Sequence, residues 1–375
     1  MVVNQYFNNI LINSRKVHDK FLENESLLSA NDYFQAKHFK GRRFENLKTH
    51  FYETFFKSNR GVKLVIGKNF ALKNYSDIHN LLNVENVEYI DTEFFFEDNS
   101  DNDFSRKCEF LRDKILITTN HDICRSNSSS LINLQKFFLN CDNTVITGWD
   151  WDNHHNLQIS SIYGLCSDIY FPSQRANEYE LSRVTNLNYF IPPSAYEWSN
   201  DFLIENQNVI FESSRPIDIF GTFNFHPRFS YRNEIVTTLN RSIPEVRFIS
   251  DFSEYTAKSQ IEKLAEWSDA KWHWIVPTLN AVSVRAFYAL IAGVGVILPV
   301  EFKSFEEFRF LDERDVVWYN ACDVLDTTRV KKETSSKYLA SGREGVIRRH
   351  KFAMQSNNCE HRIADMLKII LDNLK

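Results

Sequence analysis

The sequence predicts an α/β fold of two Rossmann-like domains that face each other across a cleft. The chain has 375 residues, which is more than one ordinary hydrophobic core needs. Apolar, β-branched runs alternate with helical segments in two separate series, as in parallel sheets with crossover helices. We expect an N-terminal domain over residues 1–205, a C-terminal domain over 206–350, and a C-terminal helix over 351–375.

The first series follows a mainly helical segment over residues 1–60, where apolar residues recur at three- and four-residue spacing. The residues between 94 and 105 are loop-like in composition. Strands are expected at 62–67, 87–96, 114–119, 143–148, 168–173 and 187–193. Helices are expected at 77–83, 131–140, 159–166 and 176–184.

The second series begins after residues 194–216, which interrupt the alternation and are typical of an interdomain connection. Strands are expected at 218–225, 245–250, 273–278, 294–300 and 315–320. Helices are expected at 231–241, 258–268 and 283–293. The C-terminal helix is amphipathic, and one face carries Ile363, Met366, Leu367, Ile370 and Leu374.

Composition narrows the class of protein. The formal net charge of −5 argues against a dedicated nucleic-acid binder, which normally has a basic surplus. No apolar run reaches the ~18 residues of a membrane-spanning helix, and the first residues lack the pattern of a signal peptide. Six scattered cysteines without a CxxC pair indicate free thiols. We therefore expect a cytoplasmic protein, with peripheral association at the inner face of the membrane left open.

Residues 273–300 carry most of the functional inference. An apolar strand ends in a turn that contains Thr278 and Asn280, and a helix starts near Ser283. Ligands of parallel sheets bind beyond the carboxyl ends of the strands, and a helix start offers free N–H groups to a phosphate. Val284 lies at this start, and Arg285 could bind phosphate oxygens with its planar guanidinium group. The alternative to a phosphate-binding site is an ordinary helix cap at Asn280 or Ser283, with the Arg285 side chain in solvent.

The sequence ALIAGVGVILP at 289–299 resembles the donor-binding segment of GT-B glycosyltransferases, especially the exostosin-like and group 1 families. The resemblance implies a nucleotide-sugar donor held mainly by the second domain. The group 1 families have two glutamates around this helix, one of which usually holds the ribose of the donor. This sequence has Asn280 and Tyr288 at those positions, so the resemblance leaves the mode of ribose recognition open.

Two further segments agree with this resemblance. Residues 218–239 resemble the strand, loop and helix that open the second GT-B domain, and residues 167–194 resemble the close of the first. The candidate donor-binding residues in the opening segment are Gly221, Thr222, His226, Arg228 and Arg232. Gly221 would let the backbone approach a ligand closely, and the basic residues would face phosphates. The His226-Pro227 pair suggests a CMP donor, because such a pair recurs in bacterial enzymes that use CMP-activated acid sugars.

The sequence GWDWDNHHN at 148–156 is the candidate catalytic segment. Sugar transfer requires a base for the acceptor hydroxyl or a carboxylate at the anomeric carbon, so we predict Asp152 first, then Asp150 and His154. Trp149 and Trp151 could form a wall on which a sugar stacks. Two alternatives stay open: a metal-binding DxD motif of the GT-A type, and a helix cap with both tryptophans in the core. His121-Asp122, after the strand at 114–119, is a second site of the same kind.

The leading hypothesis is a glycosyltransferase of class EC 2.4 that moves a sugar from a UDP-, GDP- or CMP-linked donor to a glycan or lipid-linked glycan. Surface polysaccharide such as lipopolysaccharide is the expected product, and neither a metal nor another cofactor is required. The alternatives are a sugar-nucleotide epimerase or hydrolase, and a two-domain sugar-binding protein without catalysis. No GxGxxG follows a predicted strand, which argues against a Rossmann dehydrogenase.

Overall fold

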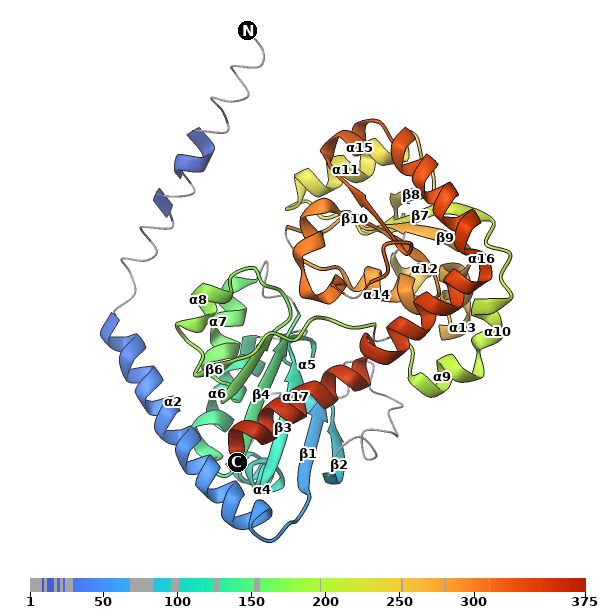
Figure 1. The fold of residues 1–375 in the computed structure, drawn as a ribbon. Helices are drawn as coiled ribbons and strands as arrows, with labels where there is room; N and C mark the ends of the chain where they lie inside the picture. Colours follow the sequence, from blue (N-terminus) through green and yellow to red (C-terminus); the bar gives the residue numbers. More distant parts are fainter. Residues whose placement is uncertain are drawn as a thin grey trace.

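The structure, a computed structural model, contains two parallel β-sheets with helices packed on them (Figure 1). This arrangement confirms the predicted α/β class with two Rossmann-like halves. The structure describes residues 9, 12–16, 19–20, 23, 30–67, 84–95, 101–124, 128–151, 156–195, 197–250, 252–279, 281–309 and 311–375.

The first sheet has six parallel strands in the order β2-β1-β3-β4-β5-β6. They are β1 (Val62–Gly67), β2 (Val84–Ile90), β3 (Lys114–Thr119), β4 (Val145–Asp150), β5 (Ile169–Pro172) and β6 (Leu187–Asn188). Each strand of the central pair β3 and β4 is almost entirely buried, because helices cover both faces of a parallel sheet. Their apolar side chains form one cluster on each face.

The helices of this half mostly lie where the sequence predicts them. They are α2 (Ala30–Phe51), η1 (Tyr52–Phe56), η2 (Thr92–Phe95), α4 (Asp101–Leu111), α5 (Asn120–Cys124), α6 (Ser128–Asn140), α7 (Leu157–Leu165) and α8 (Glu178–Ser182). The predicted helix at 77–83 lies outside the described residues.

Two predictions for this half are wrong in part. The strand predicted over 87–96 ends at Ile90, and a 3₁₀ turn, η2, follows it. Helix α4 starts at Asp101, within the stretch that the sequence presents as a loop. Aspartates in the first turn favour a helix start, and Leu111 at the end of α4 is buried in the core.

The second sheet has five parallel strands in the order β11-β10-β9-β7-β8. They are β7 (Ile217–Phe223), β8 (Val246–Phe248), β9 (Ala270–Trp274), β10 (Gly295–Pro299) and β11 (Val316–Tyr319). The helical elements are α11 (Ser230–Asn240), α12 (Phe252–Ala257), α13 (Gln260–Ser268), α14 (Val284–Ile291), η3 (Val300–Ser304), η4 (Glu306–Phe308) and α15 (Ala321–Leu325). Helix α14 is buried along most of its length, so its orientation is fixed by packing.

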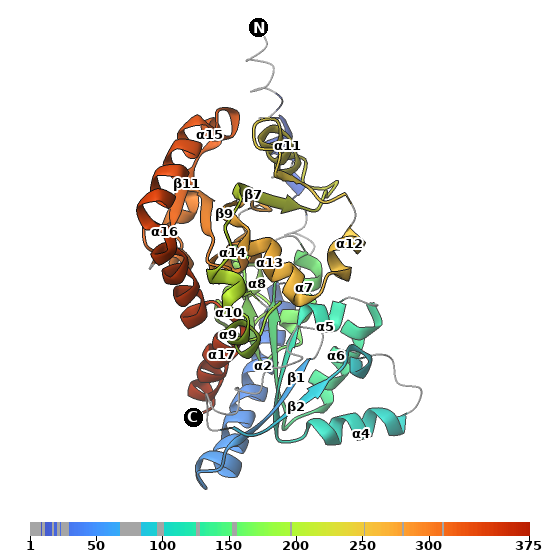
Figure 2. The same ribbon diagram turned by 90° about the vertical axis from the view of Figure 1, so that its right-hand side faces the viewer.

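The connection predicted at 194–216 contains two short helices, α9 (Asn200–Glu205) and α10 (Gln207–Phe211). The chain crosses back between the two halves after the long helix α16 (Thr328–Ser356), which was not predicted from the sequence. The two segments that connect the halves are hydrogen-bonded to each other: the backbone N–H of Ala195 donates to the carbonyl oxygen of Asn357 at 3.2 Å. Figures 1 and 2 show α16 on the second sheet and the C-terminal helix on the first.

The C-terminal helix α17 (Cys359–Leu374) packs on the first sheet although it follows the second half in sequence. Its predicted apolar face is confirmed, because all five predicted side chains lie in the core of the first half: Ile363, Met366, Leu367, Ile370 and Leu374. The domain boundaries at 205 and 350 stay predictions. Among the described residues, no helix combines the length and the apolarity that crossing a bilayer requires.

Candidate functional site

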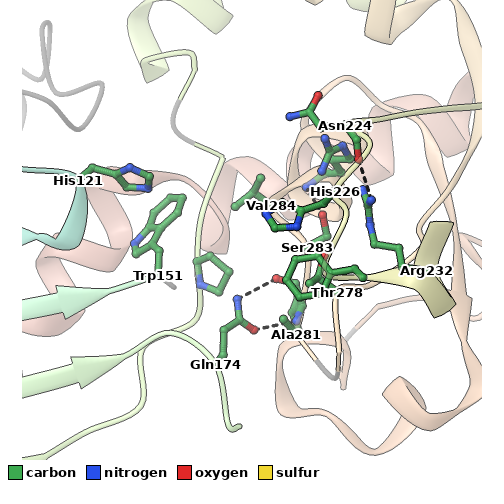
Figure 3. A pocket seen from close by; sticks show the side chains of 14 residues that line it. His121, Trp151, Gln174, Asn224, His226, Arg232, Thr278, Ala281, Ser283 and Val284 are labelled. Atoms are coloured by element: carbon green, nitrogen blue, oxygen red, sulfur yellow. Dashed lines mark hydrogen bonds between the residues drawn. The ribbon is translucent and has the colours of Figure 1, made fainter. Parts of the chain in front are cut away.

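A cavity of about 320 Å³ lies between the carboxyl ends of the two sheets (Figure 3). Residues that follow β3, β4, β5 and β6 form the wall from the first half, and residues that follow β7 and β9 form the opposite wall. The lining residues are His121, Trp151, Gln174, Pro193, Asn224, His226, Phe229, Arg232, Thr278, Ala281, Val282, Ser283, Val284 and Arg285. This is the position where parallel α/β sheets bind their ligands.

The first turn of α14 faces this cavity. Ser283 is the N-cap of α14, and its hydroxyl oxygen accepts a hydrogen bond from the backbone N–H of Arg285 at 3.3 Å. In the preceding turn, the backbone N–H of Ala281 donates to the carbonyl oxygen of Thr278 at 3.1 Å. Leu279 in this turn has a φ of 55°, a left-handed conformation that is uncommon for leucine. The cavity therefore meets a helix N-terminus, whose N–H groups and partial positive charge favour anions.

Basic side chains hold the opposite end of α14. The carbonyl oxygens of Ile291, Ala292 and Gly293 accept hydrogen bonds from His350 (2.6 Å), Arg215 (2.9 Å) and Arg349 (2.8 Å), in that order. Arg215 and Arg349 are almost completely buried, and each is a cation at the negative end of the helix dipole. These contacts fix α14 along its axis, so its N-terminus has a defined position in the cavity.

Two guanidinium groups lie near the ring of Phe223. The central carbon of Arg232 is 5.1 Å from the ring centroid, and that of Arg285 is 5.4 Å away. Arg285 Nε donates to the carbonyl oxygen of Thr222 at 3.0 Å, and Arg232 Nη1 donates to that of Asn224 at 2.8 Å. Burial and the neighbouring Arg285 lower the pKa of Arg232 to about 10. This side of the cavity is therefore positively charged.

No described residue that lines the cavity is a carboxylate, and within the described residues Arg232 has no ion pair. His226 packs on Phe229 with the ring centroids 4.5 Å apart. Its Nδ1 is buried and has no hydrogen-bond partner in the described part of the chain. The second-domain wall thus offers positive charge and an unused ring nitrogen to a ligand.

The structure brings together six of the predicted donor-binding residues: His226, Arg232, Thr278, Ser283, Val284 and Arg285. The others have different positions. Arg228 is exposed and does not line the cavity. Thr222 contributes its carbonyl oxygen to Arg285. Asn280 lies outside the described residues.

Gly221 and Tyr288 also lie outside the lining. A Cβ at Gly221 would meet the carbonyl oxygen of Trp274 at 3.2 Å, so contact with the neighbouring strand explains the glycine. The ring of Tyr288 packs against Trp198 at 5.3 Å and Trp267 at 5.5 Å between centroids. Tyr288 is buried in the core of the second half.

The described residues of the candidate catalytic segment at 148–156 divide between the core and the cavity. Asp150 is buried and accepts a hydrogen bond from the Tyr170 hydroxyl at 2.6 Å, and it does not line the cavity. Trp149 and Trp151 pack together with ring centroids 4.9 Å apart, and of these two only Trp151 lines the cavity. Asp152 and His154, one and three residues after Trp151 in the sequence, lie outside the described residues.

His121 lines the cavity on the same wall, and its ring meets that of Trp151 edge-on at 6.4 Å. It lies in the short helix α5, whose start is held by Asp122. The carboxylate of Asp122 accepts hydrogen bonds from the backbone N–H and the hydroxyl of Thr119, both at 2.8 Å. The sequence indicated His121 only as a second site. Gln174 was not predicted, although it follows the strand at 168–173 in the same way.

Gly67 at the end of β1 provides the space for Asp122, because an added Cβ would overlap the Asp122 carboxylate. We expect Gly67→Ala to lower the free energy of unfolding by about 1–3 kcal/mol, the usual cost of overpacking. Gly41→Ala is the control, since a Cβ added to Gly41 in α2 would meet no heavy atom within 4 Å. The control should be neutral or stabilising by up to ~1 kcal/mol. Urea unfolding measures both, and equal effects would contradict this account of Asp122.

The buried His273 in β9 predicts acid sensitivity. Its ring stacks on Trp267 at 4.6 Å, and burial, followed by the charge of Arg285, lowers its pKa from 6.5 to about 3. Between these values the unfolded chain binds a proton that the folded chain does not, so stability falls as the pH falls from 6.5 to 3. The loss is at most about 1.4 kcal/mol per pH unit. Urea unfolding of wild type and His273→Phe over this range should give a steeper dependence for wild type, and equal slopes would contradict the prediction.

The described residues contain no group of three or more histidine, cysteine, aspartate or glutamate side chains placed to hold a metal ion. The positive groups of the cavity wall are arginines and a helix N-terminus.

No protein-family model and no curated protein sequence matches this chain. Several solved structures have a similar fold. An α-glucosyltransferase in complex with UDP and a 13-mer DNA containing a central A:G mismatch has a TM-score of 0.54 at 11% identity, over 83% of this chain and 100% of that chain. A structure of α-glucosyltransferase in complex with UDP has a TM-score of 0.50 at 11% identity, over 88% and 96%. The sucrose-phosphate synthase of Thermosynechococcus elongatus has a TM-score of 0.50 at 9% identity, over 83% and 98%. The chain thus has the GT-B fold, with two Rossmann-like halves that face each other across the cavity.

Proposed function

We propose that this protein is a glycosyltransferase that moves a sugar from a nucleotide-sugar donor to an acceptor hydroxyl. The observation that supports this most strongly is the composition of the second-domain wall. The N-terminus of α14 and the guanidinium groups of Arg232 and Arg285 meet there, and no described lining residue is a carboxylate. Such a wall needs negative charge from its ligand, and the diphosphate of a sugar nucleotide supplies it.

The same groups would assist the departure of the nucleotide. Negative charge develops on the phosphate as the bond to the sugar breaks, and fixed positive groups stabilise that charge. Arg285 is held by Thr222, and α14 is held at its far end, so these groups need little rearrangement during the reaction. We therefore propose transfer that requires neither a metal ion nor another cofactor.

The acceptor would bind to the first-domain wall beside Trp151, and a group there would remove the proton from its hydroxyl. Asp152 is the first candidate and His154 the next, because both closely follow Trp151 in sequence. His121 faces the cavity from the neighbouring strand end and is a further candidate. We assign Asp150 a structural role because it is buried against Tyr170.

This proposal does not specify the nucleotide of the donor or the identity of the acceptor. UDP is the first nucleotide to test because two of the similar structures contain it, while GDP and CMP stay candidates. An acceptor in surface polysaccharide, such as lipopolysaccharide, is a proposal from the sequence resemblance. Peripheral association with the inner face of the membrane is a proposal from the composition of the sequence. The DNA in one similar structure belongs to that protein, and the absence of a nucleic-acid partner here stays a prediction from the net charge.

A thermal-shift panel of UDP, GDP, CDP and CMP, with and without Mg²⁺, tests the donor proposal. A nucleotide at 100 times its dissociation constant should stabilise the protein by ~2.7 kcal/mol, which shifts the unfolding midpoint visibly. The effect should persist in EDTA. If no nucleotide shifts the midpoint, the proposal is wrong. Consumption of the sugar nucleotide at an undiminished rate without any acceptor would favour the epimerase or hydrolase alternative instead.

A further inference from the structure

Gln174 joins the two walls of the cavity directly. Its side-chain Nε2 donates to the carbonyl oxygen of Val282 at 3.0 Å, and its Oε1 accepts from the N–H of Val282 at 2.7 Å (Figure 3). Gln174 follows β5 of the first sheet, whereas Val282 follows β9 of the second. Gln174 is only 4% exposed, so both hydrogen bonds are shielded from water. A carboxamide is the side-chain group that matches one backbone donor and one backbone acceptor of the same residue.

Val282 lies next to the residues at the start of α14 that would bind the donor phosphate. It directly precedes Ser283, which caps α14 and accepts the hydrogen bond from the N–H of Arg285. The next residue, Val284, packs against the core clusters of both halves. The first domain therefore helps to place the start of α14, although α14 belongs to the second domain.

The residue after Gln174 makes a second contact of the same kind. Arg175 Nη2 lies 3.6 Å from a carboxylate oxygen of Glu306 and 3.7 Å from one of Glu307. Both glutamates lie in η4, which follows β10. Two consecutive residues of the first half thus contact the loops after two neighbouring strands of the second sheet.

We infer that Gln174 is a positioning residue that holds Val282 and Ser283, at the start of α14, in their phosphate-binding conformation only while the two domains are closed on each other. Binding of the donor and closure of the domains are then coupled, because opening the domains breaks both hydrogen bonds of Gln174 to Val282, the residue next to the N-cap of α14. The identity of the ligand rests on the proposed function, whereas the coupling rests on the hydrogen bonds of Gln174.

Replacing Gln174 with leucine tests this inference by two independent measurements. Hydrogen–deuterium exchange of peptides covering residues 276–287 should become about tenfold faster, because Val282 loses both partners. Calorimetric titration with UDP should show an affinity lower by about tenfold or more, since part of the binding energy then has to order the loop. With a sugar nucleotide, KM for the donor should rise in proportion, while kcat at saturating donor should change less.

Two other variants complete the test. Gln174→Glu keeps an acceptor for the N–H of Val282 but places an oxygen against its carbonyl, so it should also weaken binding. Gln260→Leu is the matched control: Gln260 donates to the carbonyl oxygen of Glu197 at 2.8 Å, away from the cavity lining. The control should change neither measurement by more than about twofold. Unchanged exchange in distant peptides shows that each variant is folded.

The outcomes are distinguishable. If Gln174→Leu leaves both the exchange at 276–287 and the nucleotide affinity within about twofold of wild type, the inference is overturned. If wild type binds no nucleotide, the proposed function fails, and the exchange measurement still decides whether Gln174 positions the loop. Faster exchange with unchanged nucleotide affinity would reject the coupling between closure and binding.

Discussion

Replacing Asp152 with asparagine is expected to lower kcat by about 100- to 10,000-fold and to leave the affinity for nucleotide unchanged. The amide cannot accept the proton of the acceptor hydroxyl, and in our proposal the nucleotide binds to the opposite wall of the cavity. Steady-state assays with a labelled sugar nucleotide give kcat, and calorimetry of the same preparation gives the affinity.

Asp150→Asn is the matched comparison, since the two carboxylates lie two residues apart. Its amide oxygen can still accept the hydrogen bond from the Tyr170 hydroxyl, so we expect a change in stability and a kcat within about threefold of wild type. Full activity of Asp152→Asn would refute the catalytic assignment. A loss confined to Asp150→Asn would assign the role to the buried carboxylate, against our account.

Arg285→Ala is expected to weaken nucleotide binding by about 10- to 150-fold. Hydrogen bonds to charged groups contribute about 1.5–3 kcal/mol, and each 1.4 kcal/mol changes affinity tenfold. The loss should become smaller at high salt, because part of it is electrostatic. Calorimetric titration with UDP at two salt concentrations measures both effects.

Arg247→Ala controls for the general loss of a positive charge in the second domain. Arg247 is exposed on β8 and does not line the cavity, so its removal should change the affinity by less than about twofold. Arg285→Lys keeps the charge but cannot make a two-pronged contact with a phosphate, and it should fall between wild type and Arg285→Ala. Equal affinities of Arg285→Ala and Arg247→Ala would show that Arg285 does not bind the nucleotide.

Much of the architecture could be predicted because buried parallel strands appear in a sequence as short apolar runs. The strand predicted at 294–300 is wholly apolar, and the strand at 114–119 has the apolar centre Ile115-Leu116-Ile117. The segments between such runs have helical spacing. The order of strand, turn and helix at 273–293 also located the cavity wall for which we propose donor binding, since the carboxyl ends of parallel strands share one edge. His226, Arg232 and Ser283 could therefore be placed near one another from their positions in the sequence.

The direction of individual side chains could not be predicted in the same way. Alternation along β4 puts Trp149 on one face of the sheet and Asp150 on the other. The sequence does not show that both side chains are buried and that only the following Trp151 reaches the cavity. Tyr288 lies on the buried side of α14, away from the cavity, for the same kind of reason. The two hydrogen bonds between Gln174 and Val282 join residues 108 positions apart, and a single sequence carries no sign of such a pairing.

The most direct test of the account is a crystal structure of the protein with the nucleotide that shifts its unfolding midpoint most. The account predicts a phosphate group of the nucleotide at the N-terminus of α14, within hydrogen-bonding distance of Ser283 and Arg285, with Gln174 still bound to Val282. A nucleotide bound outside the cavity, or one whose phosphates do not touch the first turn of α14, would contradict it.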